Sequence, residues 1–418
     1  MKIEVPYGKE KINLTIPKKN ILDIITEKKN DLKVAENNII SYALNNPVNS
    51  KKLSELCKES HNACIIVSDI TRPCPSYKFL PQIITEINNG GIDNKDIRVI
   101  IGLGIHRKHS EDEKRKLLGD FCYEKVEVMD SDPLSTRVIG TTTSGTPVEV
   151  FREALNNDLL IATGNIEYHY FAGYSGGAKA VMPGICSRNS IQANHSMMLN
   201  EKSVAGNYLD NPIRNDIEEA GKLIGIDFVF NVILDDHKKI IDAVAGSNNK
   251  AWIEGVKRYD SIYSIEVASR ADIVVVSPGG FPKDINLYQA QKALDNVKDL
   301  VEDEGTIILM ALCNEGFGED VFENWMEDAR NYELICRRLK ENFELGGHKA
   351  VTIAKVTSSK NVHLYSDFDE KTTQKMGFNK ITDIQLYLNE RIQRDNNLKI
   401  TIVPNGRFLK VSHYSPST

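Results

Sequence analysis

The 418-residue chain is longer than one ordinary hydrophobic core supports, so its length predicts two domains. Hydrophobic residues make up 41% of the chain and charged residues 26%, a balance typical of a soluble globular protein. The net charge is −6 and no basic block is present, which argues against nucleic acid as a partner.

The sequence gives no sign of a targeting or membrane segment. Its first residues, MKIEVPYGKEKINLTIP, have no apolar core of signal-peptide length, and no apolar run approaches the ~18 residues of a membrane span. The seven cysteines are scattered, odd in number and without a C-x-x-C pair, which argues against a zinc knuckle or a disulfide framework. We therefore expect a protein of the reducing cytoplasm without a membrane partner.

The start of the chain predicts a hairpin, two helices and a buried strand. Alternating residues in Met1–Pro17 predict two strands that turn at Tyr7-Gly8, at the edge of a sheet. Two polar helices are expected near Asp31–Asn45 and Asn49–Ser60, and the apolar run Asn62–Asp69 predicts a buried strand.

The residues after this strand are candidates for binding a ligand. Pro73 and Pro75 stop the strand, and a helix is predicted over Ser76–Asn89. Asp69 and Arg72 therefore lie at the carboxyl end of a strand, where open parallel sheets bind ligands. The alternative is a local Asp–Arg pair that stabilises the turn.

A second buried strand, Asp96–Leu103, leads to a histidine on a loop. Ser110 and Glu113 form a capping box for the next helix, so His106 lies between a strand end and a helix start. The N-terminus of a helix disfavours the imidazolium ion, so we expect His106 to stay neutral and able to accept a proton. His109 is interpreted as solvent-facing or structural and is given no role.

The densest group of candidate residues is Gly164–His195, which follows a predicted strand at Asp158–Thr163. The unperturbed pKa of histidine lies close to neutral, so His169 is a candidate general acid or base. Lys179, on a glycine-flanked loop, is a candidate covalent anchor or a charge partner for an anionic ligand.

The same segment holds a candidate metal ligand. A helix is predicted over about Arg188–Asn200, and His195 lies about two turns into it. A protein metal site normally has three or four ligands, so the other donors at His195 must come from something other than side chains. Gly176 and Gly177 remove side chains where something comes close to the backbone. The alternative is a glycine-rich connector with a hydrogen-bonded histidine.

The middle of the chain predicts an antiparallel pair and a domain boundary. The pair is expected at Phe228–Leu234 and Lys239–Ala245, and a long helix follows over about Ala251–Arg270. The boundary placed after this helix gives an N-terminal domain of residues 1–270 and a C-terminal domain of residues 271–418.

The second half alternates strands and helices. Strands are predicted at Ala271–Ser277, Gly305–Leu312 and residues 349–356, 361–366 and 399–404. This alternation predicts an α/β fold in which each domain has a mainly parallel sheet flanked by helices.

Three strand ends carry the candidate residues of the first domain. Asp69 and Arg72 follow one strand, His106 follows the next, and His169 follows a third. Because open parallel sheets bind ligands at the carboxyl ends of their strands, we expect these residues to line one crevice.

The run His169…GYSGGAKAVMPG…His195 resembles the signature of the nickel-dependent lactate racemase family. The resemblance implies that Lys179 covalently carries a nickel-pincer nucleotide, pyridinium-3,5-bisthiocarboxylic acid mononucleotide. It implies that His195 completes the nickel coordination, since the carbon and two sulfurs of the pincer supply the missing donors. His169 and His106 would be the two acid–base histidines.

The resemblance also assigns roles around these residues. The family has a matching D-x-T-R-P run, which implies that Arg72 holds a substrate carboxylate and that Asp69 orients it or contacts the cofactor. Gly176 and Gly177 would lie against the cofactor. Enzymes that make the cofactor are the implied protein partners.

The second half carries a matching G-G-x-P-x-D…Y-Q-x-x-K run. The resemblance implies that Tyr288, Gln289 and Lys292 reach the substrate across a cleft between the domains. The family has a late tryptophan in the substrate pocket, but the two tryptophans of this chain lie elsewhere and the nearest counterpart is the segment that ends at His348. This difference leaves the 2-hydroxy acid open and favours one larger or more polar than lactate.

The sequence thus predicts an isomerase, a racemase or epimerase of a 2-hydroxy acid that moves a hydride to and from the nickel cofactor. Two alternatives keep the fold and need no cofactor. One is a lyase or hydrolase that uses His106 and His169, and the other is a two-domain protein that binds an anion.

Overall fold

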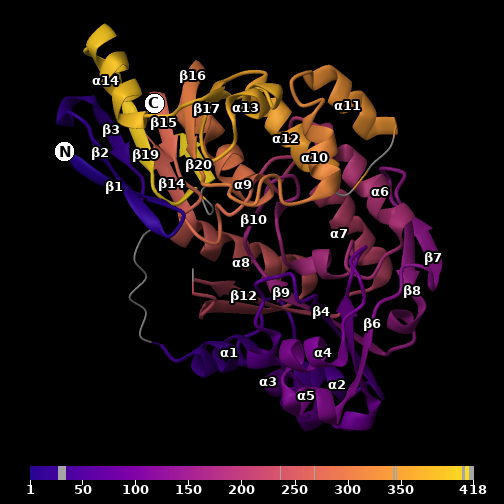
Figure 1. The fold of residues 1–418 in the computed structure, drawn as a ribbon. Coiled ribbons are helices and arrows are strands. Elements are labelled where there is room, and N and C mark those ends of the chain that lie inside the picture. The colour runs from indigo at the N-terminus through magenta and orange to yellow at the C-terminus, as the bar shows by residue number, and fades with distance from the viewer. Residues whose placement is uncertain are drawn as a thin grey trace, which may run out of the picture. The chain divides into compact units, whose positions relative to one another are not determined.

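The computed structural model describes residues 1–26, 34–235, 237–267, 269–341, 344, 346–406 and 410–413. The chain forms two compact units, a central unit, Asn30–Ile262, and a terminal unit made of Met1–Lys29 and Tyr263–Thr418. Each unit has a six-stranded sheet, and in both the neighbouring strands are mostly parallel (Figure 1). The predicted two-domain α/β fold is therefore confirmed.

The sheet of the central unit has the strand order β13-β12-β9-β4-β5-β6, and only β12 and β13 pair antiparallel. These strands are β4 (Ala63–Ser68), β5 (Ile97–Gly102), β6 (Glu127–Asp130), β9 (Leu159–Asn165), β12 (Phe228–Leu234) and β13 (Ile240–Gly246). Two small hairpins accompany it, β7 (Thr136–Thr141) with β8 (Pro147–Phe151), and β10 (Tyr168–His169) with β11 (Gly173–Tyr174).

Helices cover both faces of this sheet (Figure 1). On one face, alternate strand residues such as Ile65, Val99 and Phe230 pack into a large core with the first five helices. On the other face, Ala162 and Val229 pack against Ala251 of the last helix of the unit. The helices are α1 (Glu36–Asn45), α2 (Leu53–Cys57), α3 (Ser76–Asn89), α4 (Glu111–Leu118), α5 (Asp120–Lys125), α6 (Arg188–Ser196), α7 (Pro212–Ile224) and α8 (Asn248–Tyr263).

The sheet of the terminal unit has the order β18-β17-β16-β15-β19-β3, and all its pairs are parallel. Its strands are β3 (Ile21–Ile24), β15 (Ala271–Val276), β16 (Val301–Met310), β17 (Asn361–Tyr365), β18 (Asn379–Lys380) and β19 (Ile400–Val403). A parallel pair, β14 (Ser264–Val267) with β20 (Lys410–His413), lies outside this sheet. The helices are α9 (Leu287–Val297), α10 (Asp320–Met326), α11 (Tyr332–Glu341), α12 (Gly347–Thr357), α13 (Glu370–Lys375) and α14 (Ile384–Arg394).

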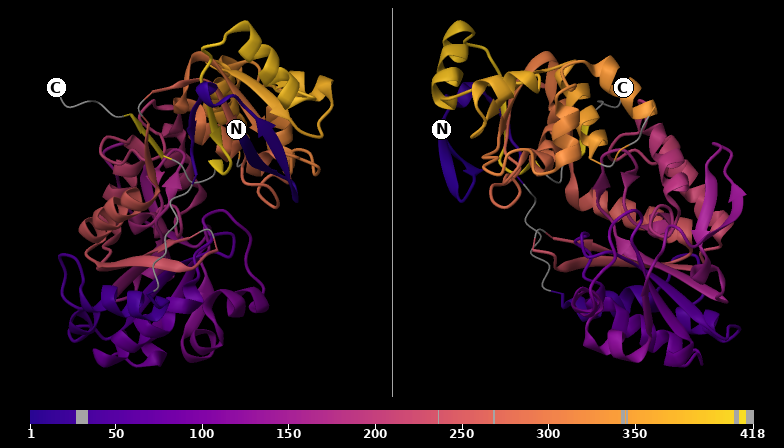
Figure 2. Two further views of the ribbon diagram at one scale, coloured as in Figure 1. Left: turned by 90° about the vertical axis from the view of Figure 1, so that its left-hand side faces the viewer. Right: turned by 45° about the vertical axis from the view of Figure 1, so that its right-hand side comes forward.

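The N-terminal hairpin, β1 (Lys2–Tyr7) with β2 (Glu10–Thr15), belongs to the terminal unit. Its apolar side chains share a core with β15, β16, β19 and α14, and Gln385 of α14 exchanges two hydrogen bonds with the backbone of Thr15. Figure 2 shows the indigo hairpin beside the yellow α14. The prediction that residues 1–270 form one domain is wrong here, because β3 pairs with β19 and carries the first residues into the other unit.

Two other predicted elements differ from the structure. The predicted strand at residues 349–356 lies in α12, whose buried residues surround the helix, and periodicity does not separate a buried helix from a buried strand in so short an apolar run. The helix predicted over Ala251–Arg270 ends at Tyr263, where β14 begins. The predicted start of the helix Asp31–Asn45 lies outside the described residues.

Within the described residues, no helix is both long enough and apolar enough to cross a lipid bilayer.

We expect Asn20 to stabilise the terminal unit. Its side chain is buried, and its amide donates to the carbonyl groups of Asn396 and Leu398, at 3.1 and 2.9 Å. Asn20→Ala leaves these carbonyls without a donor and should lower the free energy of unfolding by roughly 1–3 kcal/mol, measured by urea denaturation. Asn13→Ala, at an exposed position, is the control and should change it by less than about 0.5 kcal/mol. Equal effects of the two substitutions would contradict this role.

Candidate active site

A pocket opens at the carboxyl ends of β4, β5 and β9, which lie side by side in the central sheet. It contains about 680 Å³ of empty space, part of it open to solvent. Four of the predicted side chains line it together: Asp69, Arg72, His169 and Lys179. The crevice expected at these strand ends is therefore present in the central unit, with Asp69, Arg72 and His169 in its lining but not His106.

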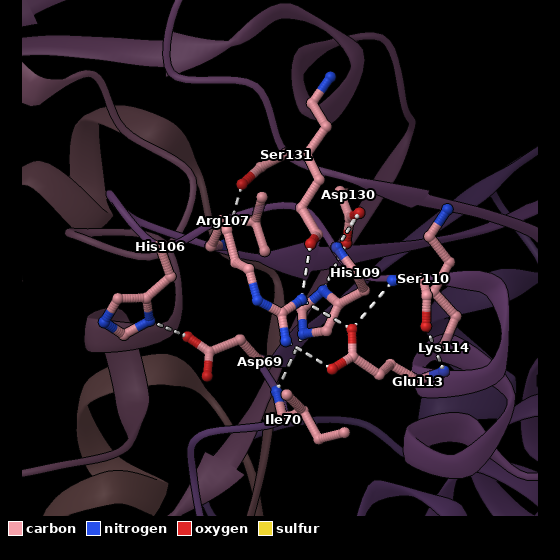
Figure 3. Close-up of polar contacts among 12 residues, drawn as sticks. Asp69, Ile70, His106, Arg107, His109, Ser110, Glu113, Lys114, Asp130 and Ser131 are labelled. Atoms are coloured by element: carbon pink, nitrogen blue, oxygen red, sulfur yellow. Dashed lines mark hydrogen bonds and ion pairs between the residues drawn. The ribbon is translucent and has the colours of Figure 1, made fainter.

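The turn after β4 places Asp69 beside His106. The Asp69 carboxylate, 3% exposed, lies 2.6 Å from Nδ1 of His106 (Figure 3). It also accepts hydrogen bonds from the backbone and hydroxyl of Thr71. An ionised carboxylate only accepts, so Nδ1 of His106 carries a proton, and in the neutral ring Nε2 holds a lone pair. His106 does not itself line the pocket, but its partner Asp69 does.

Two opposing effects set the charge of Asp69. Burial raises the pKa of this carboxyl group, but the hydrogen bonds from His106 and Thr71 outweigh it and lower the pKa to about 2. Asp69 is therefore a permanent anion at neutral pH and fixes the orientation of the His106 ring.

Arg72 presents a positive charge to the pocket. Its side chain is exposed, and the described part of the chain gives its guanidinium no hydrogen bond or ion pair. Asp69 is engaged with His106 and Thr71 instead, so the structure does not show the alternative of a local Asp69–Arg72 pair. The guanidinium of Arg72 is thus available to bind an anion bidentately.

His169 lies on the short hairpin of β10 and β11, which follows β9. Tyr168 and Tyr174 pair with each other in this hairpin, and both donate to the carboxylate of Asp260 in α8. These hydrogen bonds fix the position of the hairpin. Nδ1 of His169 accepts a hydrogen bond from the backbone N–H of Ala172 at 3.3 Å. Since that nitrogen accepts, the neutral ring of His169 carries its proton on Nε2.

Lys179 lies on the 3-10 turn Gly177–Ala180. Burial and, after it, the charges of Arg72 and Arg214 lower the pKa of its amine to about 7, although Glu167 acts in the opposite direction. The described residues offer Nζ of Lys179 no hydrogen bond or ion pair. At neutral pH the Lys179 amine is therefore unprotonated, and so nucleophilic, in a large fraction of the molecules.

Side chains behind the glycine loop hold Lys179 in place. Arg214, fully buried, donates to the carbonyl groups of Tyr174 and Gly176, and its guanidinium stacks 3.5 Å from the centre of the Trp252 ring. The indole N–H of Trp252 donates to the carbonyl of Ser175 at 2.9 Å. The carbonyl groups of the three successive residues 174–176, just before the turn that carries Lys179, are thus fixed by buried side chains.

The two glycines before Lys179 have different surroundings. Gly176 lines the pocket. A Cβ at Gly177 would lie 2.8 Å from the Trp252 ring and 2.9 Å from the Arg214 guanidinium, and its φ is +59°. What comes close to Gly177 is therefore the protein itself, and both packing and backbone conformation require glycine there.

His195 lies on α6 and is not among the residues that line the pocket. Its Nδ1 is 3.1 Å from Oδ1 of Asn194, and its ring packs against the ring of Phe171. The amide of Asn194 donates to Asp216 and to the carbonyl of Ile213, which fixes its orientation and turns its oxygen toward His195. Nδ1 of His195 therefore donates, and in the neutral ring the lone pair is on Nε2.

The three predicted substrate residues of the second half lie on α9 of the terminal unit. Tyr288 is partly buried under the ammonium group of Lys349, which lies 3.2 Å from the centre of its ring, whereas Gln289 is exposed. Lys292 lies one turn further along the same helix. The pocket described above has none of these three among its lining residues.

The segment that replaces the expected tryptophan is part of the interior. His348 is 5% exposed at the start of α12, and burial lowers its pKa to about 3. Trp325 packs so close to Gly347 that a Cβ there would lie 2.3 Å from its ring. The neutral His348 is therefore a packed core residue, and no tryptophan takes the place of the expected one among the described residues of this segment.

The sequence-based prediction gives no role to several residues that hold the site. Asn231 accepts from the backbone of Gly177, and His109 accepts from the backbone of Ile70. Their partners lie 54 and 39 residues away in the sequence. A polar residue inside an apolar strand, such as Asn231 in β12, is the one local signal that points to such a role.

Family models match most of the chain. Residues 7–206 match the lactate racemase N-terminal domain, and residues 267–411 match the lactate racemase C-terminal domain.

Two named relatives extend this match. The lactate racemase of Thermoanaerobacterium thermosaccharolyticum is 33% identical over 427 residues, which cover 97% of each chain. The lactate racemase of Lactiplantibacillus plantarum is 34% identical over 337 residues, 78% of each chain.

Solved structures agree with the sequence matches. The lactate racemase apoprotein of T. thermosaccharolyticum superimposes with a TM-score of 0.89 at 31% identity, over 99% of this chain and 100% of that one. A protein of Thermotoga maritima superimposes with a TM-score of 0.64 at 16% identity, over 93% of this chain and 100% of that one, and shares the fold. The chain therefore belongs to the lactate racemase family and is an isomerase of the racemase type.

Proposed function

We propose that this isomerase inverts the α-carbon of a 2-hydroxy acid by moving a hydride rather than a proton. The observation that carries the proposal is the convergence on one pocket of a cation, an acid–base histidine and a neutral lysine amine, in Arg72, His169 and Lys179. The relatives named lactate racemase support it.

The chemistry requires more than side chains. The α-proton of a 2-hydroxy acid is weakly acidic, so its direct removal is slow. If the α-hydrogen leaves as a hydride while a base takes the hydroxyl proton, the product is a planar 2-keto acid. Return of the hydride to the other face then inverts the configuration at the α-carbon. No natural side chain accepts a hydride, so a cofactor must do so.

The residues present fit a nickel-pincer nucleotide. Lys179 offers an unprotonated amine at the pocket for the covalent bond, and Arg72 offers a positive charge. The described residues contain no cluster of three or more side chains that could hold a metal, so the cofactor itself must supply most donors to nickel. The bound cofactor supplies the hydride acceptor.

His195 has the donor atom that nickel needs. Nδ1–H of His195 donates to Asn194, so the neutral ring has its lone pair on Nε2, the atom that would bind the metal. His195 is therefore the proposed nickel ligand, Lys179 the proposed anchor, and Gly176 and Asp69 the proposed neighbours of the cofactor. Gly177 acts through the packing of the loop.

The two acid–base histidines rest in complementary forms. Asp69 leaves Nε2 of the neutral His106 ready to accept the substrate hydroxyl proton. Ala172 leaves the neutral His169 with a hydrogen on Nε2 that can donate a hydrogen bond to the substrate oxygen, and His169 returns a proton only after it has been protonated to the imidazolium ion. Arg72 holds the substrate carboxylate while the protons move. One histidine, as the neutral base, takes the proton from the oxygen, and the other, as the imidazolium ion, returns one, and their roles exchange in the reverse reaction.

The substrate is a small molecule. Residues in the second half of the chain are proposed to contact it and to select its substituent on the α-carbon. Tyr288, Gln289 and Lys292 are the proposed substrate contacts there. Since the expected pocket tryptophan is absent, we propose a 2-hydroxy acid larger or more polar than lactate. The enzymes that make the cofactor are the proposed protein partners.

The first prediction concerns the cofactor. Protein made together with the cofactor-making enzymes should carry nickel and a covalent adduct on Lys179, detected by intact mass, peptide mapping and metal analysis. His195→Ala should lose nickel, because the Nε2 donor is gone, while keeping the adduct; Lys179→Ala should lose the adduct. An active preparation without adduct and without metal would contradict the mechanism and favour a lyase or hydrolase. Anion binding without turnover would favour a binding protein.

The second prediction uses the amine of Lys179. Because its pKa is about 7, the unmodified protein should be acylated at Lys179 faster than at surface lysines, whose pKa is ordinarily about 10.4. The rate should rise with pH and level off above about pH 8, measured by trace acylation and mass spectrometry. A Lys179 rate that still rises in parallel with those of surface lysines at pH 9 would show that the amine is not neutral.

The third prediction concerns turnover. His106→Ala and His169→Ala should each lower kcat by about a hundredfold or more, since each removes one positioned acid–base group. Both directions of interconversion should fall together, because the equilibrium between enantiomers fixes their ratio. A panel of enantiopure aliphatic, aromatic, dicarboxylic and sugar 2-hydroxy acids measures both points. If lactate is the best substrate by a wide margin, the inference from the missing tryptophan is wrong.

A further inference from the structure

His109 is buried beside the site although the proposed chemistry does not use it. Its side chain is 2% exposed and lies on the loop that also carries His106, just before the capping box of α4. Figure 3 shows its ring between Asp130, at the end of β6, and Ile70, in the turn after β4. Of the two expectations for His109, solvent-facing or structural, the structural one therefore holds, and its contacts show more than a space-filling role.

The hydrogen bonds of His109 define its protonation. Nε2 lies 3.2 Å from the backbone nitrogen of Ile70, which can only donate, so Nε2 accepts. Nδ1 lies 2.8 Å from Oδ1 of Asp130, and Oδ2 of Asp130 accepts from the backbone N–H of His109 at 3.0 Å. An imidazole that accepts at Nε2 is neutral and carries its proton at Nδ1, where the carboxylate of Asp130 accepts it.

The bond to Ile70 reaches the residues that line the pocket. The turn after β4 is partly closed on itself, because Asp69 accepts from the backbone N–H groups of both Thr71 and Arg72. The N–H of Ile70 instead leaves the turn and binds His109. The position of Asp69 and Arg72 relative to the loop that carries His106 therefore depends on this bond as well as on the Asp69–His106 pair.

We propose that His109 is a positioning residue, which as a neutral imidazole holds the Asp69–Arg72 turn in place against the His106 loop. The role rests on the proposed function in that Asp69 and Arg72 act on the substrate or cofactor. His109 itself touches neither. It links the carboxyl end of β6 to that of β4, across the loop that follows β5 between them.

The first test needs no variant and no cofactor. In protein labelled with nitrogen-15, the ring nitrogens of His109 should show the pattern of a neutral imidazole with its proton on Nδ1 at pH 7. An imidazolium ion, or a proton on Nε2, would overturn the proposal, because neither form can accept from Ile70.

The second test compares His109→Leu, which fills the space without an acceptor, with His109→Gln, whose side-chain oxygen can replace Nε2. Hydrogen exchange of the Ile70 amide should become roughly tenfold faster in His109→Leu, the factor that corresponds to one lost hydrogen bond, and should stay near wild type in His109→Gln. His61→Leu, at a side chain that is 94% exposed, is the matched control and should change nothing at Ile70. Equal exchange in His109→Leu and wild type would overturn the proposal.

Turnover of the loaded enzyme separates this proposal from the proposed function. The kcat should fall roughly ten- to a hundredfold in His109→Leu and recover at least partly in His109→Gln, since a small displacement of catalytic groups has effects of this size. A kcat that is unchanged in His109→Leu overturns the positioning role. If the exchange and tautomer results hold but loaded wild type inverts no 2-hydroxy acid, the proposed function fails while the structural link through His109 stands.

Discussion

The parallel pairing of β4 with β5 and β9 is the constraint on which the site depends. The register sets Ser68 of β4 opposite Gly102 of β5, and Ile66 opposite Ala162 of β9, so all three strands end at one edge of the sheet. Each strand is buried on both faces and therefore has one stable position. The polar residues that follow the strands are brought together by packing that involves none of them.

Each of the three histidines with a proposed role in catalysis or metal binding is held by a hydrogen bond to a neutral group or to a carboxylate that is itself hydrogen-bonded. Asp69 orients His106, Ala172 orients His169, and Asn194 orients His195, each through a single nitrogen of the ring. A histidine held at one nitrogen presents the other in a known protonation state. Lys179, the proposed anchor, differs from these histidines, since its surroundings lower the pKa of its amine and leave the amine without a partner among the described residues.

Sequence patterns predict features that depend on neighbouring residues. They do not predict the residues whose roles depend on contacts between distant parts of the chain. Strand ends, the cap at Ser110 and the glycine loop are local, and Asp69, Arg72, His169 and Lys179 were found from them. Arg214, Asn231 and His109 act on backbone groups 38 to 54 residues away, and no spacing rule reports such contacts. The segment 349–356 shows a further limit, because a helix buried all round has no polar face to give a period.

The place of the N-terminal residues affects how the chain folds during synthesis. Ile21 of β3 pairs with Ile400 of β19, and Asn20 binds the carbonyl of Leu398, contacts that span 378 or more residues. At ordinary translation rates the first strands emerge on the order of tens of seconds before their partners. The central unit is continuous in sequence and can form in that interval. The apolar face of the N-terminal hairpin must meanwhile remain uncovered and β3 must remain without its partner strand, so the sheet of the terminal unit is completed only after β19 has been made.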